Sequence, residues 1–400
     1  MSTIKSSSED LTLNADGSNE VKFQINAVEK ASISSAGAFT STTIDATKLT
    51  GEKRNYIIDG DMTQFPEGTV TGAVASYIGA LWDGYRSGAA TDWDGSQETT
   101  ILPTVGQSGH NSAQCLKIDI QTADASIAAA DLAYIEYNVT GTDYQHLHGQ
   151  QVTLNFWIRS TATGTFYASF SNSARNRSLV SAFTIDSSDT WEEKTVTVTL
   201  DTSGTWLFTE ADVGLRVCIT PLTVGSNHYA SSADAWEAGH RRGLSGMGNL
   251  ASSASNNIYI SQVGLYLGST APTFSSESIS TVRDQVDYYV ERDDFDVTSG
   301  EKISMEAWTS SSSQLQIQYR YRKKRAIPAI TSSAASTMNA STIGVTGGTG
   351  TAISFSNITE QIAQITWTGT GTPWSSLTGE SVIFNRLSTN TTWIMVDARH

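Results

Sequence analysis

The stretch QQVTLNFWIRS, residues 150–160, decides the fold class of this chain. Val152, Leu154, Phe156 and Ile158 fall on one side of it, and Thr, Asn, Trp and Arg fall on the other. This period of two residues is that of a β-strand with one face in a core. The same alternation recurs in DLAYIEYNV (131–139), GTFYASFSNS (164–173), WEEKTVTVTL (191–200), VGLRVCITP (213–221) and NNIYISQVGLYLG (256–268). Many short alternating strands predict a two-sheet antiparallel sandwich of the jelly-roll kind.

The composition predicts an all-β chain in four parts. Residues 1–50 form a lean N-terminal β segment, and residues 51–277 carry the jelly roll. Residues 278–298 are expected to form a short connecting helix. Residues 299–400 return to alternating strands such as QLQIQYRYR (314–322) and predict a smaller C-terminal β-sandwich.

Charge and hydropathy exclude several classes of function. The chain has 400 residues, of which 16% are charged, against roughly 25% in an average soluble domain. A net charge of −15 disfavours a nucleic-acid partner, because no broad basic face is present. No run approaches the ~20 apolar residues of a membrane span. No secretory signal is visible, so we expect synthesis and folding in a cytoplasm.

The segment SNEVKFQINAVEKASISSAG, residues 18–37, alternates like a hairpin and has little to bury. Val21, Phe23 and Ile25 share one face. A hairpin this poor in apolar bulk is marginal alone in water. Identical copies wound around a common axis would supply the missing core, so we predict that these three residues contact sister subunits. The alternative is a flexible polar leader.

The segment SSESISTVRDQVDYYVERDDFD, residues 275–296, contains the one convincing helix. Ser278 is expected to cap its N-terminus. Ile279, Val282, Val286 and Tyr289 recur at spacings of three and four residues, which indicates a short apolar seam. The seam packs either on its own domain or around a threefold axis. In the second case Ile279, Val282 and Val286 belong to the trimer interface.

The residue types that carry out catalysis or bind metals are present, but their spacing in the sequence predicts neither an active site nor a metal site. The acidic pairs Asp92 with Asp94, Glu192 with Glu193 and Asp293 with Asp294 have nothing to orient an acid against a base, so we expect no enzyme and no catalytic residues. Alternation would put His146 and His148 on one strand face, but two ligands do not make a zinc site. We expect them in a loop or on an edge strand. Cys115 and Cys218 lie in apolar runs, where free buried thiols are common; whether they pair stays open. No cofactor is expected.

Aromatic side chains in polar segments are the candidates for sugar binding, because a flat ring stacks on a pyranose and amides or carboxylates bind its hydroxyls. The segments Trp82–Arg86 and Asp92–Asp94 have this chemistry, as does the loop SNHYASSADAWEAGHRRG (226–243). Trp82, Trp157 and Trp191 are expected in the core. The predicted glycan-binding residues are Asp92, Trp93, Asp94, Tyr229, Trp236, Arg241 and Trp374.

The basic run Arg320–Arg325 is unusual in so acidic a chain. A nucleic-acid patch would need further basic residues elsewhere. A charged strand edge that resists unwanted pairing is the simpler interpretation. Contact with an anionic glycan is a second one.

Three passages together resemble the structural proteins of tailed bacteriophages. NADGSNEVKFQINAVEKASISSAG (14–37) resembles their fibre-forming N-terminal segments, and RNYIIDGDMTQFPEG (54–68) resembles the start of a carbohydrate-binding-module-like jelly roll of tail fibres. The run Gln262–Gly268 is similar to the end of that domain. Asp287-Tyr288-Tyr289, KKRAIPAI (323–330) and the closing VDAR (396–399) also look like those fibres, in the same order.

This resemblance implies a virion protein: a homotrimeric tail fibre whose N-terminus attaches to other tail or adaptor proteins and whose jelly roll or tip adheres to a host surface glycan. Two alternatives stay open, namely a head or neck fibre with a purely architectural role and a polysaccharide depolymerase. Carbohydrate-binding jelly rolls often hold a structural calcium near their opening motif. Here Asp59-Gly60-Asp61-Met62 is followed by Thr63 where a carboxylate would stand, so no metal site is predicted.

Overall fold

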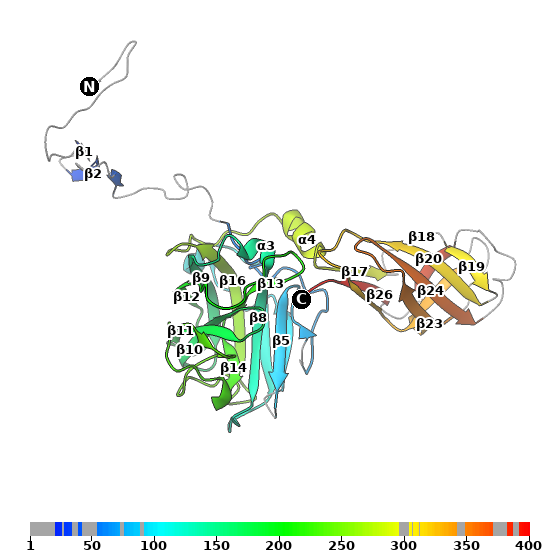
Figure 1. Cartoon of the computed structure of the whole chain (residues 1–400), viewed down its shortest axis with the longest axis horizontal. Coiled ribbons are helices and arrows are strands. Elements are labelled where there is room, and N and C mark those ends of the chain that lie inside the picture. The colour runs from blue at the N-terminus through cyan, green and yellow to red at the C-terminus, as the bar shows by residue number, and fades with distance from the viewer. Residues whose placement is uncertain are drawn as a thin grey trace, which may run out of the picture. The chain divides into compact units, whose positions relative to one another are not determined.

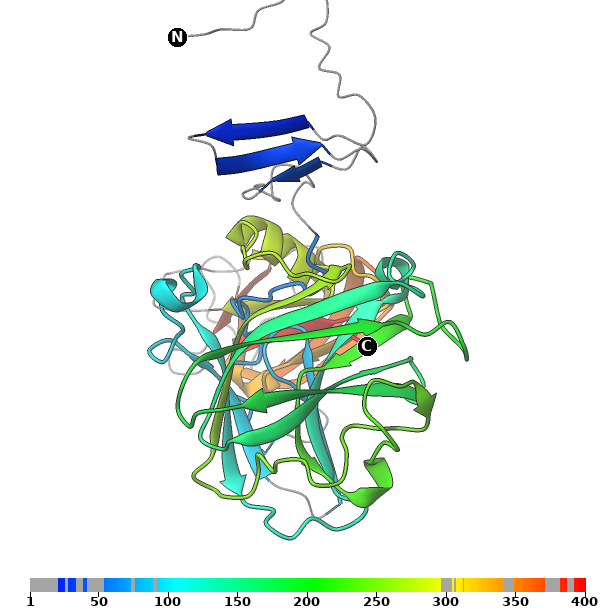
Figure 2. The ribbon, with the colours of Figure 1, turned by 90° about the vertical axis from the view of Figure 1, so that its left-hand side faces the viewer.

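The computed structural model describes residues 21–25, 28–33, 39–41, 54–72, 76–88, 92–295, 304–305, 307–311, 313–341, 349–370, 382–386 and 392–400. The chain divides into two compact units, Met1–Arg54 and Asn55–His400. In the first unit, β1 (Val21–Ile25), β2 (Val28–Ile33) and β3 (Phe39–Ser41) form an antiparallel meander (Figure 2). The side chains of Val21, Phe23 and Ile25 lie outside the described features, so their trimer contact stays a prediction.

The jelly-roll prediction is confirmed, because two antiparallel sheets follow the first unit (Figure 1). The large sheet has the order β15-β11-β10-β13-β8-β5-β4, with β14 also paired to β8. Its strands are β4 (Ser76–Tyr77), β5 (Trp82–Ser87), β8 (Leu132–Thr140), β10 (Gly164–Ser171), β11 (Arg177–Ile185), β13 (Val213–Cys218), β14 (Pro221–Val224) and β15 (Glu237–Ala238). The small sheet has the order β12-β9-β16-β7-β6. Its strands are β6 (Asp92–Glu98), β7 (Cys115–Thr122), β9 (Gln151–Ser160), β12 (Glu192–Thr199) and β16 (Asn257–Leu267).

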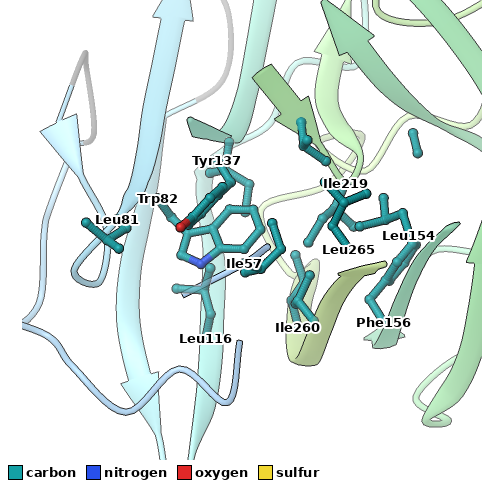
Figure 3. Packing of buried hydrophobic residues seen from close by; sticks show 14 of the residues in the cluster. Ile57, Leu81, Trp82, Leu116, Tyr137, Leu154, Phe156, Ile219, Ile260 and Leu265 are labelled. Atoms are coloured by element: carbon teal, nitrogen blue, oxygen red, sulfur yellow. The ribbon is translucent and has the colours of Figure 1, made fainter. Parts of the chain in front are cut away.

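The core lies between these sheets. The predicted face of β9, from Val152 to Ile158, is fully buried there, as are Trp82 and Tyr137 of the large sheet. Figure 3 shows Trp82 beside Tyr137, with Leu154 and Phe156 among the aliphatic side chains that fill the same space. Trp157 and Trp191 are also buried, as expected, in a smaller cluster with Cys115 and Tyr259.

Short helices connect the strands. They are α2 (Val105–Ser108), α3 (Gly141–Tyr144), the 3₁₀ turn Ser226–His228 and, in the C-terminal part, a second 3₁₀ turn, Ala335–Thr337. His146 and His148 follow α3 in a turn, which is the first of the two expected positions. In the described parts of the chain no helix is long and apolar enough to cross a membrane.

The connecting helix α4 is shorter than predicted, spanning Ile279–Asp287. The Ser278 side chain accepts a hydrogen bond from the Thr281 backbone N–H, which confirms the cap. Val282 and Val286 are buried in the jelly-roll core, and Ile279 is 49% exposed. The seam therefore packs on its own domain, so the structure corrects the assignment of Val282 and Val286 to a trimer interface. Strand β17 (Val290–Phe295) begins three residues after the helix ends.

The C-terminal sandwich is confirmed by two further antiparallel sheets, with the orders β17-β26-β21 and β18-β25-β22-β23-β24-β20-β19. Their other strands are β18 (Ser304–Met305), β19 (Ala307–Ser311), β20 (Gln314–Arg320), β21 (Ala329–Ser332), β22 (Met338–Ser341), β23 (Thr349–Ser356), β24 (Ile362–Thr370), β25 (Val382–Arg386) and β26 (Thr392–Asp397). Leu315, Ile317 and Tyr319 of β20 pack with Ile365 and Trp367 in its core.

The basic run Arg320–Arg325 contacts both sandwiches and does not form a free strand edge. Lys324 is fully buried, and its ammonium group donates to the Asp287 carbonyl and the Glu291 carboxylate. Arg325 donates to the Glu210 carbonyl of the jelly roll at 3.0 Å. Arg322 pairs with Asp284 and Asp287 of α4. The structure thus corrects the strand-edge interpretation, because β20 ends at Arg320 and is paired on both sides.

A second brace comes from the end of the chain. The Arg399 guanidinium is nearly buried, contacts Glu67 and Asp397, and donates to the Ala80 carbonyl at 3.0 Å. It lies over the Tyr77 ring at 3.9 Å, and the Tyr77 hydroxyl donates to the His400 carbonyl at 2.7 Å. These contacts place His400 next to the large sheet of the jelly roll.

Candidate functional site

The outer face of the large sheet, the face opposite the core, carries two rows of polar side chains. The strand register places Ser171 of β10, Arg216 of β13 and Asn138 of β8 in one row. Glu136 of β8 and Asp83 of β5 are partners in the next row. On each strand the neighbouring residues point into the core, which leaves these five on the outer face. We call these two rows the polar face.

Glu136 is the centre of the polar face. Its side chain is fully buried, and three guanidinium groups surround it. Arg175, from the turn between β10 and β11, and Arg216 both donate to Oε1, and Arg242 donates to Oε2. Burial alone would raise the pKa of Glu136, but the three positive charges outweigh it and lower the pKa to about 2. The carboxylate is therefore ionised at any physiological pH.

A long loop holds Arg242 in place. Residues 225–249 cross one end of the polar face, and Arg242 lies over the Tyr134 ring at 4.1 Å. Its Nη1 donates to the Ser169 hydroxyl at 3.0 Å, and its Nε donates to the His240 ring at 3.0 Å. Burial and the charge of Arg242 lower the pKa of His240 to about 3, so this ring is neutral and acts as the acceptor.

The other end of the polar face has buried hydrogen-bonding groups with no protein partner. Among the described residues these are the Asn138 amide Nδ2, the Ser171 hydroxyl and the His400 ring Nε2. Asn138 and Ser171 flank Arg216 in one row, and the positive charge of Arg216 helps, after burial and Arg325, to lower the pKa of His400 to about 3. Native proteins satisfy nearly all such groups, and these are closed off from solvent, so they indicate places for buried water.

Asp83 completes the polar face at β5. Its carboxylate makes no hydrogen bond or ion pair with the described residues, although Glu136 lies in the same row. Burial and the negative charge of Glu136 raise the pKa of Asp83 to about 6, against the attraction of Arg175, Arg216 and Arg399. Next to it, Tyr85 is half-buried and stacks on Tyr134 with ring centroids 5.1 Å apart. The face thus combines an aromatic ring, amides, hydroxyls and charges of both signs.

The predicted residues of β6 do not form a sugar-binding surface. Trp93 is fully buried in the core, which corrects the expectation that its ring stacks on a sugar. Asp92 pairs with Arg86 at 3.0 Å, and Asp94 accepts a hydrogen bond from the Gly72 backbone N–H. These carboxylates therefore organise neighbouring loops at the edge of the small sheet.

Of the predicted residues in the loop, Tyr229 lies on the outer side of the large sheet. Tyr229 is half-buried and packs with Tyr134 and Cys218 in a cluster on the outer side of the large sheet. Arg241 pairs with Glu237 at 3.3 Å and donates to the Asn227 carbonyl. The Trp236 indole donates to the Thr199 carbonyl and meets the Trp206 ring edge-on. Trp374 lies outside the described residues.

The carboxylates of the opening motif are occupied within the protein. Asp59 accepts from Thr63 and from the Gln64 backbone N–H, and Asp61 contacts His110 at 3.0 Å and Ser112 at 2.5 Å. Across the described ranges no group of three histidine, cysteine or acidic residues is arranged to hold a metal. Cys115 and Cys218 are both buried free thiols.

Sequence reasoning missed most of the polar face. Glu136 stands in LAYIEYNV and Arg216 in VGLRVCIT, each a lone charge in an apolar run. A charged side chain in the middle of a central strand destabilises the fold unless it has a partner. These two lone charges could therefore have indicated that partners lie nearby in the fold. The partner arginines come from distant turns and loops, which no local pattern connects.

Comparison with known proteins gives structural neighbours only. No protein-family model matches the chain, and no curated protein matches it. The neighbours are mainly carbohydrate-binding modules with a jelly-roll fold. One is a family 11 module of a cellulosomal cellulase of Clostridium thermocellum, with 10% identity over 52% of this chain and 99% of the module, at a TM-score of 0.26. Another is TmCBM61 bound to β-1,4-galactotriose, with 10% identity over 54% of this chain and 99% of the module, at a TM-score of 0.27.

A phage protein is also among the neighbours. The enzymatically active domain of tailspike protein 4 of bacteriophage CBA120 aligns with 50% of this chain, at 9% identity and a TM-score of 0.27. The match spans 21% of the tailspike chain. Likenesses at these scores describe a shared arrangement of strands and carry no argument about function.

Proposed function

We propose that this chain is a non-enzymatic glycan-binding protein of a phage virion, a homotrimeric tail fibre that adheres to the host surface through the polar face of its jelly roll. One observation carries the glycan-binding part: Arg216 and Arg175 are 12% and 27% exposed, and each keeps a guanidinium nitrogen that bonds to no described residue. Sugars present dense hydroxyl groups, which are the natural partners of amides, hydroxyls and charged side chains. The half-buried Tyr85 adds an aromatic ring at the edge.

The virion part of the proposal is supported by the sequence resemblance to phage fibres and by the separate N-terminal meander. In this account the first unit attaches to other virion proteins and three copies share one core. Each jelly roll then contributes a weak sugar contact, and several contacts held together bind far more tightly than one.

A glycan-binding assay with a matched pair of variants tests the site. Tyr85 is half-buried on the polar face, so Tyr85→Ala removes an aromatic surface on which a sugar ring can stack. An aromatic contact contributes about 0.5–1.5 kcal/mol, so we expect affinity to fall about 2- to 10-fold for the full chain on a glycan array. Trp393→Ala on β26 removes a half-buried aromatic side chain of the C-terminal sandwich and is the control. Equal affinity of the two variants for every bound glycan would refute the site.

The trimer has its own test. Light scattering of the full chain should give three times the 42.9 kDa of one chain. A well-folded monomer at micromolar concentration would contradict the fibre assembly, and it would leave the glycan site to be judged by the array.

A further inference from the structure

We infer that the glycan held by the polar face is an acidic saccharide, whose carboxylate binds to Arg216 and Arg175. This inference rests on the proposed glycan-binding function and names the chemical class of the sugar. It follows from the charge of the cluster and from the free donors that its arginines retain.

The charge of the cluster is unbalanced toward the positive side. Three guanidinium groups share the single carboxylate of Glu136, although the chain as a whole carries −15. Asp83, the next acid on the face, forms no ion pair with any of them. Buried charges are usually paired, because an unpaired one loses its hydration without compensation. The excess positive charge therefore favours an anion as the missing partner.

The two outer arginines keep free donors. Arg216 uses Nε on the Ser173 carbonyl and Nη1 on Glu136 and Asn138, which leaves Nη2 without a bond to the described residues. Arg175 donates from Nε and Nη2 to Glu136, which leaves its Nη1 also without a bond to the described residues. Their side chains are 12% and 27% exposed, whereas that of Arg242 is fully buried. Solvent, and hence a ligand, reaches the first two arginines and not the third.

The geometry fits a carboxylate. A guanidinium group presents its N–H donors in a planar fork, which matches the two oxygens of a carboxylate. Glu136 holds Arg175 and Arg216 through one shared oxygen, Oε1, so the two guanidinium groups are neighbours. The half-buried Tyr85, two residues along β5 from Asp83, offers a ring on which the sugar can lie.

Asp83 gives the site its selectivity for sugars over simple anions. Its carboxylate lies in the row of Glu136 and would repel a small anion, but it accepts hydrogen bonds from sugar hydroxyls. An acidic monosaccharide offers one negative edge and several hydroxyl edges. The polar face presents the matching pair, with arginines on β13 and the β10–β11 turn and an acid on β5.

A paired array tests this inference with the full chain. Bacterial surface polysaccharides are printed twice, once native and once with their carboxyl groups chemically reduced to alcohols. We expect binding to carboxylated glycans on the native copy and loss of at least tenfold in affinity on the reduced copy. Equal binding on both copies overturns the acidic-sugar inference and leaves the proposed glycan function standing. Absence of binding on both copies overturns the proposed function and this inference with it.

A matched pair of arginine variants locates the effect. Arg175→Gln removes a guanidinium of the polar face, and Arg159→Gln removes one of similar exposure on β9, where it pairs with Asp189. A charged hydrogen bond contributes enough that its loss should weaken binding of carboxylated glycans about 10- to 100-fold in Arg175→Gln. Arg159→Gln should stay within about twofold. If both variants bind alike while circular dichroism shows both folded, the assignment of the carboxylate to this cluster is wrong.

Should Arg175→Gln fail to fold, the salt dependence of the unmodified chain decides. Binding through a half-exposed ion pair weakens as salt shortens the Debye length from roughly 10 Å at 0.1 M to about 3 Å at 1 M. Affinity for the native glycans should therefore fall several-fold over this range. A salt-independent affinity would overturn the ionic contact.

Discussion

Replacing Asp83 by Asn should stabilise the protein at neutral pH, because the polar face holds this carboxylate at a cost. Burial, followed by the negative charge of Glu136, raises the pKa of Asp83 from 3.8 to about 6. The attraction of Arg175, Arg216 and Arg399 opposes the rise without cancelling it. Each unit of pKa corresponds to about 1.4 kcal/mol, so the ionised form destabilises the fold by on the order of 3 kcal/mol. Asn keeps the shape and removes the charge.

The pH dependence gives this prediction its sign. Between about pH 4 and pH 6 the folded state binds more protons than the unfolded chain at Asp83, so stability falls as the pH rises through this window. The gain from Asp83→Asn should be full near pH 7.5 and absent below pH ~4. Urea unfolding followed by tryptophan fluorescence at a series of pH values measures it. Asp119→Asn on β7, where the acid is 34% exposed beside Lys117, is the control and should change stability by less than about 0.5 kcal/mol. A gain that did not vary with pH would refute the reasoning.

Three further predictions follow from the described contacts. Glu136→Gln leaves three guanidinium groups without their carboxylate, so it should lower the free energy of unfolding in urea by about 3–5 kcal/mol. Glu210→Gln on an exposed loop is the control and should lower it little. Similar losses in both variants would contradict the central role of Glu136. Arg399→Ala removes the contacts with Glu67, Asp397 and Tyr77, so the single thermal unfolding transition seen by calorimetry should split into two. A single transition at an unchanged temperature would mean that the Arg399 contacts do not couple the two sandwiches. Val282→Ala should lower the free energy of unfolding by about 2 kcal/mol and leave the mass in solution unchanged. Ile279→Ala should change neither the stability nor the mass. If Val282→Ala caused the assembly to dissociate, the helix would belong to a trimer interface after all.

The sequence predicted the fold well because alternation is local. The period of β9 requires only that Val152 to Ile158 face one side, and the burial of that side follows. The helix was overestimated at its end because Tyr289 and Val290 continue the apolar spacing, yet β17 pairs with β26, a strand a hundred residues later. Pairing at that distance leaves no trace in the neighbouring residues.

The site was harder to predict for the same reason. Trp93 lies between two aspartates, a pattern typical of an exposed turn, but β6 directs the indole into the core while both carboxylates stay at the edge. The polar face is made by strand register, which brings Ser171, Arg216 and Asn138 together from three strands. Only the lone charges of Glu136 and Arg216 in apolar strands gave a local signal, and their meaning depends on partners from turns elsewhere.

The most direct test of the account is an experimental structure of the full chain with the tightest-binding glycan from the array. The account predicts a sugar carboxylate within hydrogen-bonding distance of Arg216 and Arg175, with sugar hydroxyl groups near Asp83. A glycan bound anywhere else, with both arginines free of it, would contradict it.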